Sequence, residues 1–219
     1  MIALIDYGAG NLTSVRKAFA AIGAEVVVPA SPGDIGSAAA IIVPGVGHIN
    51  ATRALEGDWT DAILARVGEG RPLLGICLGM QWLFEGSEEA PDCPGLGVLA
   101  GNCFRLGGRL EPDAKSDTPT GNAAGETPIK VPHVGWNSIA LRRESPIADG
   151  VPDATQMYFT HSFAAPVTGD TVAVTVHGRP FAAIVQRGSI VGVQFHPEKS
   201  GGAGLQILRN FIALAGIMH

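Results

Sequence analysis

The segment Arg71-Pro72-Leu73-Leu74-Gly75-Ile76-Cys77-Leu78-Gly79-Met80-Gln81 decides the fold. Its first half is a short apolar run, which is typical of a buried strand. Its second half continues into residues 82–84 with apolar side chains at helical spacing. Cys77 lies at the junction, with Gly75 and Gly79 two residues to either side. This pattern predicts a nucleophile elbow, a strand-to-helix turn so sharp that only small residues fit beside the nucleophile.

The position of Cys77 favours a reactive thiolate. The N-terminus of the helix that follows attracts negative charge, so it stabilises the deprotonated sulfur. The alternative is a buried structural cysteine, which is the commoner fate of this residue type. The paired glycines and the change from strand to helix favour the nucleophile.

A second motif, Gln194-Phe195-His196-Pro197-Glu198, supplies a base for such a nucleophile. Residues two apart on an extended segment point the same way, so Glu198 can accept a hydrogen bond from His196 and orient its imidazole. Pro197 keeps the backbone between them extended. A surface turn would be the alternative interpretation of this motif alone. Beside the elbow, it completes a candidate Cys77-His196-Glu198 triad.

The composition predicts one α/β domain with a large core. The chain has 219 residues, of which 46% are hydrophobic, and its formal net charge is −5. No basic run supports nucleic-acid binding, and no apolar run is long enough for a membrane span. Three cysteines without a C-x-x-C pair, and no signal-like start, predict a reducing cytoplasm. The cysteine and histidine spacings indicate no metal site.

The order of patterns predicts a mixed, mostly parallel central sheet flanked by helices, with additional antiparallel strands in the C-terminal half. The expected strands are 1–5, 25–28, 39–43, 72–76, 103–106, 134–141, 156–162, 171–176, 182–186 and 190–195. The expected helices are 11–22, one or two within 50–68, and 202–215. The acidic segment 85–94 is predicted to be a surface loop. Gly8 and Gly10 do not complete a dinucleotide fingerprint, because Thr13 occupies the third glycine position, so no cofactor is expected.

These motifs resemble the triad-type (class I) glutamine amidotransferases, and the resemblance covers nearly the whole chain. Further motifs resemble the glutaminase subunits of imidazole glycerol phosphate synthase in particular. They are Asp6-Tyr-Gly-Ala-Gly-Asn-Leu12, Pro44-Gly-Val-Gly47, Val131-Pro-His-Val-Gly-Trp-Asn137, Tyr158-Phe-Thr-His-Ser-Phe163 and His196-Pro-Glu-Lys-Ser200. The triad motif indicates only the superfamily, whereas these five select the subunit. The chain departs from the pattern at Phe163, where Tyr is common, and in the long segment 107–127.

The resemblance assigns roles to residues around the triad. An elbow enzyme takes one oxyanion donor from the residue after the nucleophile, here Leu78, and one from a neighbouring loop. The resemblance implies that the loop donor is Val46, in a peptide that flanking glycines allow to reorient. It also implies that glutamine is bound by Gly47, Gln81, Ser162 and Phe163. His161 is a candidate second base without a carboxylate two residues on.

The resemblance also implies a partner, the (β/α)₈-barrel cyclase subunit, in a heterodimer. Asn11, Trp136 and Lys199 would lie at that interface. The chain would hydrolyse L-glutamine and pass ammonia to the cyclase, which makes imidazole glycerol phosphate and an aminoimidazole carboxamide ribotide in histidine biosynthesis. Three alternatives stay open: a glutaminase subunit for another pathway such as vitamin B6 synthesis, a stand-alone cysteine hydrolase, and a regulatory subunit without chemistry.

Residues 1–219 are expected to form a single domain. The segment 107–127 is rich in Gly, Pro, Asp, Thr and Ala and lacks apolar periodicity. A segment this long without a pattern predicts a mobile surface insertion.

Overall fold

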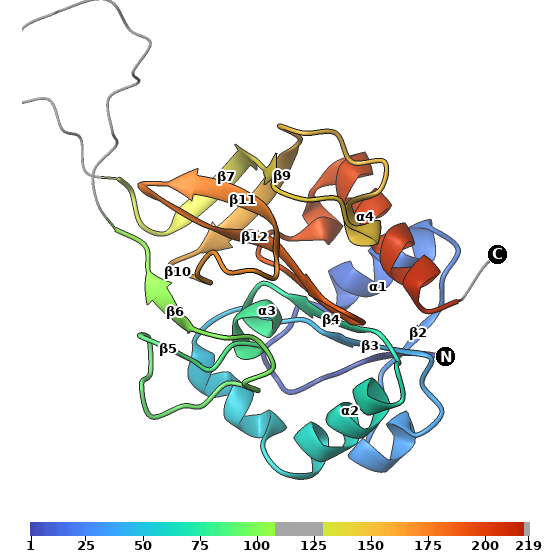
Figure 1. Ribbon diagram of the computed structural model, residues 1–219. Helices are drawn as coiled ribbons and strands as arrows, with labels where there is room; N and C mark the ends of the chain where they lie inside the picture. The colour runs from blue at the N-terminus through green and yellow to red at the C-terminus, as the bar shows by residue number, and fades with distance from the viewer. Residues whose placement is uncertain (108–128, 217–219) are drawn as a thin grey trace, which may run out of the picture.

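The computed structural model describes residues 1–107 and 129–216. The predicted insertion at 107–127 therefore lies almost entirely outside the described residues. The described chain forms an eight-stranded sheet in the order β2-β1-β3-β4-β13-β12-β11-β8, with a three-stranded sheet β10-β6-β5 and a two-stranded ribbon β7-β9 beside it. Figure 1 shows the ribbon and the three-stranded sheet at the same end of the molecule.

The large sheet contains β1 (Ile2–Leu4), β2 (Val26–Val27), β3 (Ala40–Val43), β4 (Leu73–Ile76), β8 (Ala140–Leu141), β11 (Thr171–His177), β12 (Arg179–Arg187) and β13 (Ile190–Val193). The smaller sheets contain β5 (Gly86–Ser87), β6 (Asn102–Arg105), β10 (Phe163–Ala164), β7 (His133–Ser138) and β9 (Gln156–His161). The helices are α1 (Leu12–Ala21), α2 (Asp58–Gly68), α3 (Leu78–Trp82) and α4 (Gly201–Leu214). Short 3₁₀ turns are η1 (Pro32–Ile35), η2 (Ile49–Leu55), η3 (Pro146–Ala148) and η4 (Pro197–Lys199).

The pairing is parallel from β2 to β13 and antiparallel from β13 to β8. The predicted mixed sheet is therefore confirmed. The parallel half is apolar on both faces because helices cover both sides. Alternation along each strand divides its residues between two cores: Ile2 and Leu4 belong to one, whereas Ala3 and Ile5 belong to the other.

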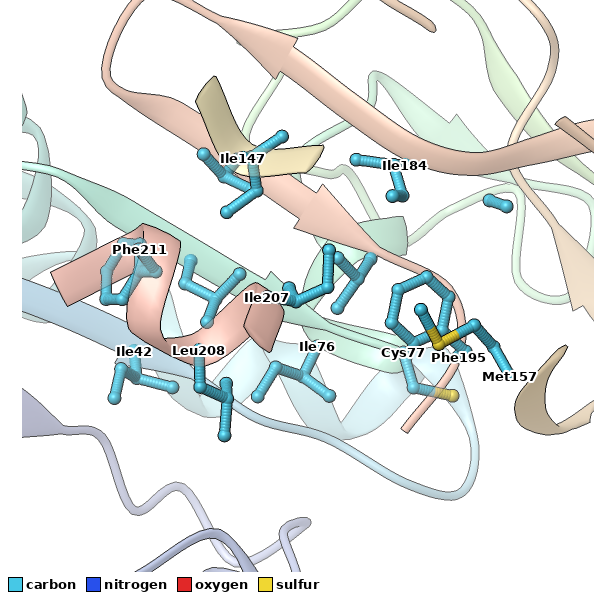
Figure 2. Packing of buried hydrophobic residues seen from close by; sticks show 14 of the residues in the cluster. Ile42, Ile76, Cys77, Ile147, Met157, Ile184, Phe195, Ile207, Leu208 and Phe211 are labelled. Atoms are coloured by element: carbon cyan, nitrogen blue, oxygen red, sulfur yellow. The ribbon is translucent and has the colours of Figure 1, made fainter. Parts of the chain in front are cut away.

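The first core lies between the sheet and the helices α1 and α4. Figure 2 shows Ile207, Leu208 and Phe211 of α4 packed over Ile42 and Ile76 of the sheet, with Cys77 at the end of this group. The second core lies under α2, through Ile63, and under α3. Figure 1 shows α2 on the opposite side of the sheet from α1 and α4. Asn11 caps the N-terminus of α1, since its side chain accepts from the Ser14 N–H at 3.2 Å.

Two expectations about local structure are wrong. The strand predicted at 134–141 divides at Ile139 into β7, which pairs with β9, and β8, which pairs with β11. The segment 85–94 is more than a surface loop, because Gly86 and Ser87 pair with β6 and two of its later residues, Ala90 and Cys93, are buried.

Candidate active site

Cys77 occupies the predicted turn between β4 and α3. Its backbone has φ 53° and ψ −104°, a strained combination for a residue with a side chain. The turn packs without room for further atoms: a Cβ on Gly75 would lie 2.6 Å from the Gly79 carbonyl oxygen. A Cβ on Gly79 would overlap the Val43 carbonyl. Both glycines are therefore required by close backbone packing.

His196 follows β13, the parallel neighbour of β4, so the ends of the two strands bring it to Cys77. Its Nδ1 lies 2.8 Å from Oε1 of Glu198, and both side chains are 2% exposed. The His196 Nε2 atom has no hydrogen-bond partner among the described residues. Burial lowers the pKa of His196, but hydrogen bonding and charge interactions with Cys77 and Glu198 outweigh it and raise the pKa to about 10. The imidazolium is therefore the favoured form of His196.

A pocket of about 230 Å³ opens above Cys77. It is lined by Val46, Gly47, Cys77, Leu78, Gln81, Glu89, Pro132, Thr160, His161, Ser162 and Phe163. Every residue that the sequence analysis assigned to the oxyanion or the substrate lines this pocket. Glu89, Pro132 and Thr160 were given no role from sequence. The volume is below the roughly 300–1,000 Å³ of sites for drug-sized ligands, so the pocket suits a small metabolite.

Both expected oxyanion donors are engaged within the protein. The Leu78 N–H donates to the Gly45 carbonyl at 3.3 Å, and the Val46 N–H donates to the Ala9 carbonyl at 2.7 Å. The Gly45–Val46 peptide therefore presents its oxygen, not its N–H, to the elbow. Gly47 next to it has φ +94°, a conformation that favours glycine. In this orientation the Val46 N–H is not available to an oxyanion at Cys77.

Comparison with known proteins decides the family. The family model for glutamine amidotransferase class-I matches residues 3–214. The chain belongs to this family. It is 41% identical to the imidazole glycerol phosphate synthase subunit HisH of Thermococcus kodakarensis over 217 residues, covering 96% of this chain and 98% of that one. It is 42% identical to the protein of the same name from Aromatoleum aromaticum over 219 residues, covering 98% of both.

Solved structures show the same fold. A crystal structure of a glutamine amidotransferase has a TM-score of 0.71 and 21% identity, covering 99% of this chain and all of that one. A chain of PurLQS from Thermotoga maritima has a TM-score of 0.68 and 16% identity, covering 97% of both chains. The amidotransferase fold is thus shared by proteins with little sequence in common.

His161 is the candidate second base of this amidotransferase. His161 lines the pocket, but its Nδ1 lies 2.8 Å from the Phe163 carbonyl and its Nε2 lies 3.1 Å from His133 Nδ1. Burial lowers the pKa of His161 to about 3, with His133 and other histidines adding to the effect. A ring with both nitrogens engaged and so low a pKa is unsuited to a second base.

Of the residues expected at a partner surface, Asn11 and Lys199 lie beside the triad, and Trp136 packs on Tyr158. Trp136 is 56% exposed, and its ring centroid lies 5.9 Å from that of Tyr158 in an edge-to-face arrangement. Lys199 lies 5.7 Å from the Tyr158 ring, and the Tyr158 carbonyl accepts from the His196 N–H. Asn11 lines a small cavity together with His196 and Glu198.

Among residues 1–107 and 129–216, no cluster of three or more His, Cys, Asp or Glu residues is arranged to hold a metal ion. No helix in this part of the chain is long and apolar enough to span a membrane.

Proposed function

We propose that this amidotransferase hydrolyses L-glutamine to L-glutamate and ammonia and delivers the ammonia to the cyclase of imidazole glycerol phosphate synthase. The observation that carries the proposal is the Cys77 thiol in an elbow at a pocket of amino-acid size, with the buried His196–Glu198 pair beside it. The names of the HisH relatives support the synthase assignment.

The chemistry follows from the three side chains. His196 takes the Cys77 proton, and the thiolate attacks the side-chain carboxamide carbon of glutamine. His196 then gives this proton to the departing ammonia as the C–N bond breaks, leaving a glutamyl thioester. It next removes a proton from water, which attacks the thioester and releases glutamate and the thiol. Glu198 holds the imidazole tautomer throughout.

The pocket offers partners for the amino-acid end of glutamine. Glu89 brings a carboxylate, whose Oε2 is held by the Ile49 N–H at 2.7 Å, and it would pair with the α-ammonium. The Nε2 of Gln81 donates to the Phe163 carbonyl and to Oε1 of Gln194. The Oε1 of Gln81 can therefore accept from the same ammonium. Backbone groups of Ser162 and Phe163 would complete the contacts.

The engaged oxyanion donors support control by a partner. With the Gly45 oxygen on Leu78, a tetrahedral intermediate would meet a carbonyl instead of a second donor. Loss of one such donor typically costs about 2.7–4 kcal/mol in the transition state. Ala9, which holds the Val46 N–H, belongs to the loop that ends at Asn11, so a partner that moves this loop would release the peptide.

The partner surface is an exposed apolar strip next to the triad. Val134 and Trp136 lie on one face of β7 and are 57% and 56% exposed, and Val176 of β11 is 61% exposed. Exposed tryptophan is unusual outside binding surfaces, where it often dominates the binding energy. Lys199, next to Glu198, adds a charge at this strip.

The test uses an electrophilic glutamine analogue with a chloroketone in place of the carboxamide. We expect one equivalent to attach to Cys77, located by peptide mass spectrometry, with protection by L-glutamine but not by L-asparagine. Cys93→Ala serves as the matched control, because Cys93 is a buried free cysteine outside the pocket. Labelling that ignores L-glutamine, or that occurs elsewhere, would contradict a glutamine site at Cys77.

A further inference from the structure

Gln194 is a fully buried amide beside the nucleophile. It is 0% exposed and follows β13, two residues before His196. Its Nε2 lies 3.6 Å from Sγ of Cys77, and its Oε1 lies 3.2 Å from Nε2 of Gln81. It does not line the substrate pocket, so it touches the sulfur from the protein side. The sequence motif around the triad contains this residue without giving it a role.

The direction of this amide is set by a backbone carbonyl. The Phe163 oxygen can only accept, so the Gln81 atom 2.7 Å away must be its NH₂ group. The second hydrogen of that NH₂ faces Gln194, which must then offer its oxygen. Gln194 is left with its NH₂ toward the Cys77 sulfur. A thiolate accepts hydrogen bonds and has no hydrogen to donate.

A second series of hydrogen bonds reaches the same carbonyl from the surface strand β7. His161 Nδ1 faces the Phe163 oxygen at 2.8 Å and must donate, so its Nε2 accepts from His133 Nδ1 at 3.1 Å. His133 Nε2 then accepts from the Asn137 NH₂ at 3.2 Å. That NH₂ is fixed independently, because it also donates to the Val176 carbonyl at 3.0 Å. The donor and acceptor atoms deduced from the Phe163 carbonyl therefore agree with those deduced from the Val176 carbonyl.

Burial keeps this series uncharged. It lowers the pKa of His133 to about 4, with His177 adding to the effect, and it lowers the pKa of His161 to about 3. The two imidazoles therefore stay neutral at physiological pH, and each keeps one donor and one acceptor. A neutral, fully paired series has one arrangement of its hydrogens, and this rigidity is transmitted to the Phe163 carbonyl and to Gln81.

We propose that Gln194 stabilises the Cys77 thiolate by donating its amide N–H, and that the buried series ending at Asn137 fixes the direction of this donor. Gln194 is then a further catalytic residue, since it touches the reacting sulfur, whereas His133 and Asn137 are positioning residues. The inference deepens the proposed glutaminase function. Its test measures the reactivity of the Cys77 thiol and not glutamate release. A failure of this inference can therefore be distinguished from a failure of the proposed function.

Other groups that face Cys77 remain in place in the test. They are His196 and, through it, Glu198, the Thr160 carbonyl 3.9 Å from the sulfur, the Tyr7 hydroxyl, His161 and the pocket carboxylate Glu89. None of them is altered by a substitution at Gln194. A change in thiol reactivity at neutral pH is therefore assigned to the lost amide.

The experiment measures the rate of Cys77 alkylation by iodoacetamide in Gln194→Met, read from the Cys77 peptide by mass spectrometry. Methionine fills a similar space without a donor. One lost hydrogen bond predicts roughly three- to tenfold slower alkylation at pH 7. At pH 10 the difference should disappear, because hydroxide then competes for the thiol proton without help from the amide. Gln186→Met is the matched control, a buried glutamine of β12 bonded to Ser145, and it should leave both rates unchanged.

Equal rates at pH 7 would overturn the proposal. An equal slowing at both pH values would also overturn it, because it would indicate altered access instead of a lost donor. If Gln194→Met does not fold, Gln81→Met takes its place. This variant keeps Gln194 but removes the hydrogen bond that fixes its amide, so the amide can flip and exchange its NH₂ and oxygen positions. We expect about twofold slower alkylation at pH 7 in that variant, and an unchanged rate would contradict the orienting role of the series.

Discussion

The elbow at Gly75–Gly79 and the loop at Pro44–Gly47 meet at one hydrogen bond but differ in how firmly they are held. The elbow is fixed by backbone contacts that exclude even a Cβ atom. The loop presents the Gly45 carbonyl to Leu78, and a Cβ on Gly47 would meet nothing within 4 Å. The nucleophile is therefore preorganised, whereas the oxyanion hole has still to be assembled. The loop is itself close-packed at Gly45, where a Cβ would lie 2.2 Å from the Tyr7 hydroxyl, so its room to move lies on the Gly47 side.

The largest effect should come from the elbow. Gly79→Ala places a methyl group on the Val43 carbonyl, so either β3 or α3 must shift. We expect a loss of about 3 kcal/mol or more in the free energy of unfolding, measured by urea titration, together with loss of activity. Gly68→Ala at the end of α2 is the control, because its Cβ would meet nothing. Similar stability in the two variants would show that the elbow is looser than its contacts indicate.

The second effect concerns the base beside the elbow. His196→Asn should lower kcat for glutamate release about 10²- to 10⁴-fold, as loss of a general acid–base usually does. The folded-state pKa of about 10 lies above the ordinary 6.5, so the protonated imidazole contributes stability that is complete below about pH 6.5 and is lost as pH rises toward 10. The wild type should therefore exceed the variant in unfolding free energy more at pH 6 than at pH 10. A difference that grows with pH would contradict an imidazolium in this site.

The third effect tests whether the partner acts through the exposed strip. Trp136→Ala should weaken binding of the cyclase roughly tenfold or more, measured by titration calorimetry, because exposed aromatic anchors dominate interfaces. The free energy of unfolding should stay within about 0.5 kcal/mol of the wild type. Val167→Ala, exposed outside the β7–β9 ribbon, is the control. Equal affinity of the two variants for the cyclase would show that Trp136 is not part of the interface.

The smallest effect probes the loop itself. Gly47→Ala adds strain at φ +94° without a steric clash, so it disfavours the conformation in which both donors are engaged. We expect glutamate release without the partner to rise about threefold, in keeping with a strain of up to about 1 kcal/mol. Gly169→Ala, which has neither positive φ nor near neighbours, should change nothing. A fall in the basal rate would mean that the active arrangement keeps the same backbone at Gly47.

Sequence predicts the elbow well, because its causes are local: apolar strand, paired glycines, helix. The division of 134–141 was not predictable, since both halves are extended and only their partners, β9 and β11, distinguish them. The sequence does not indicate a role for Glu89, because an acidic segment is typical of a solvated loop. Only the folded structure shows that this carboxylate lines the pocket.

The hydrogen-bonded amides and imidazoles were also beyond reach from sequence. Gln194, Gln81 and His133 come from three segments, and their roles depend on which atom faces which carbonyl. The signal available was chemical: polar residues at Gln194 and His133 within otherwise buried strand patterns need partners. Such residues indicate a network without specifying its members.

We infer that the Cys77 nucleophile is already in place in the free protein and that a partner completes its oxyanion hole. The most direct measurement is glutamate release from L-glutamine by the wild type and Cys77→Ala, each alone and with the cyclase and its nucleotide ligand. We expect strong release only from the wild type in the liganded complex, and none from Cys77→Ala. Equal wild-type release with and without the partner would contradict it.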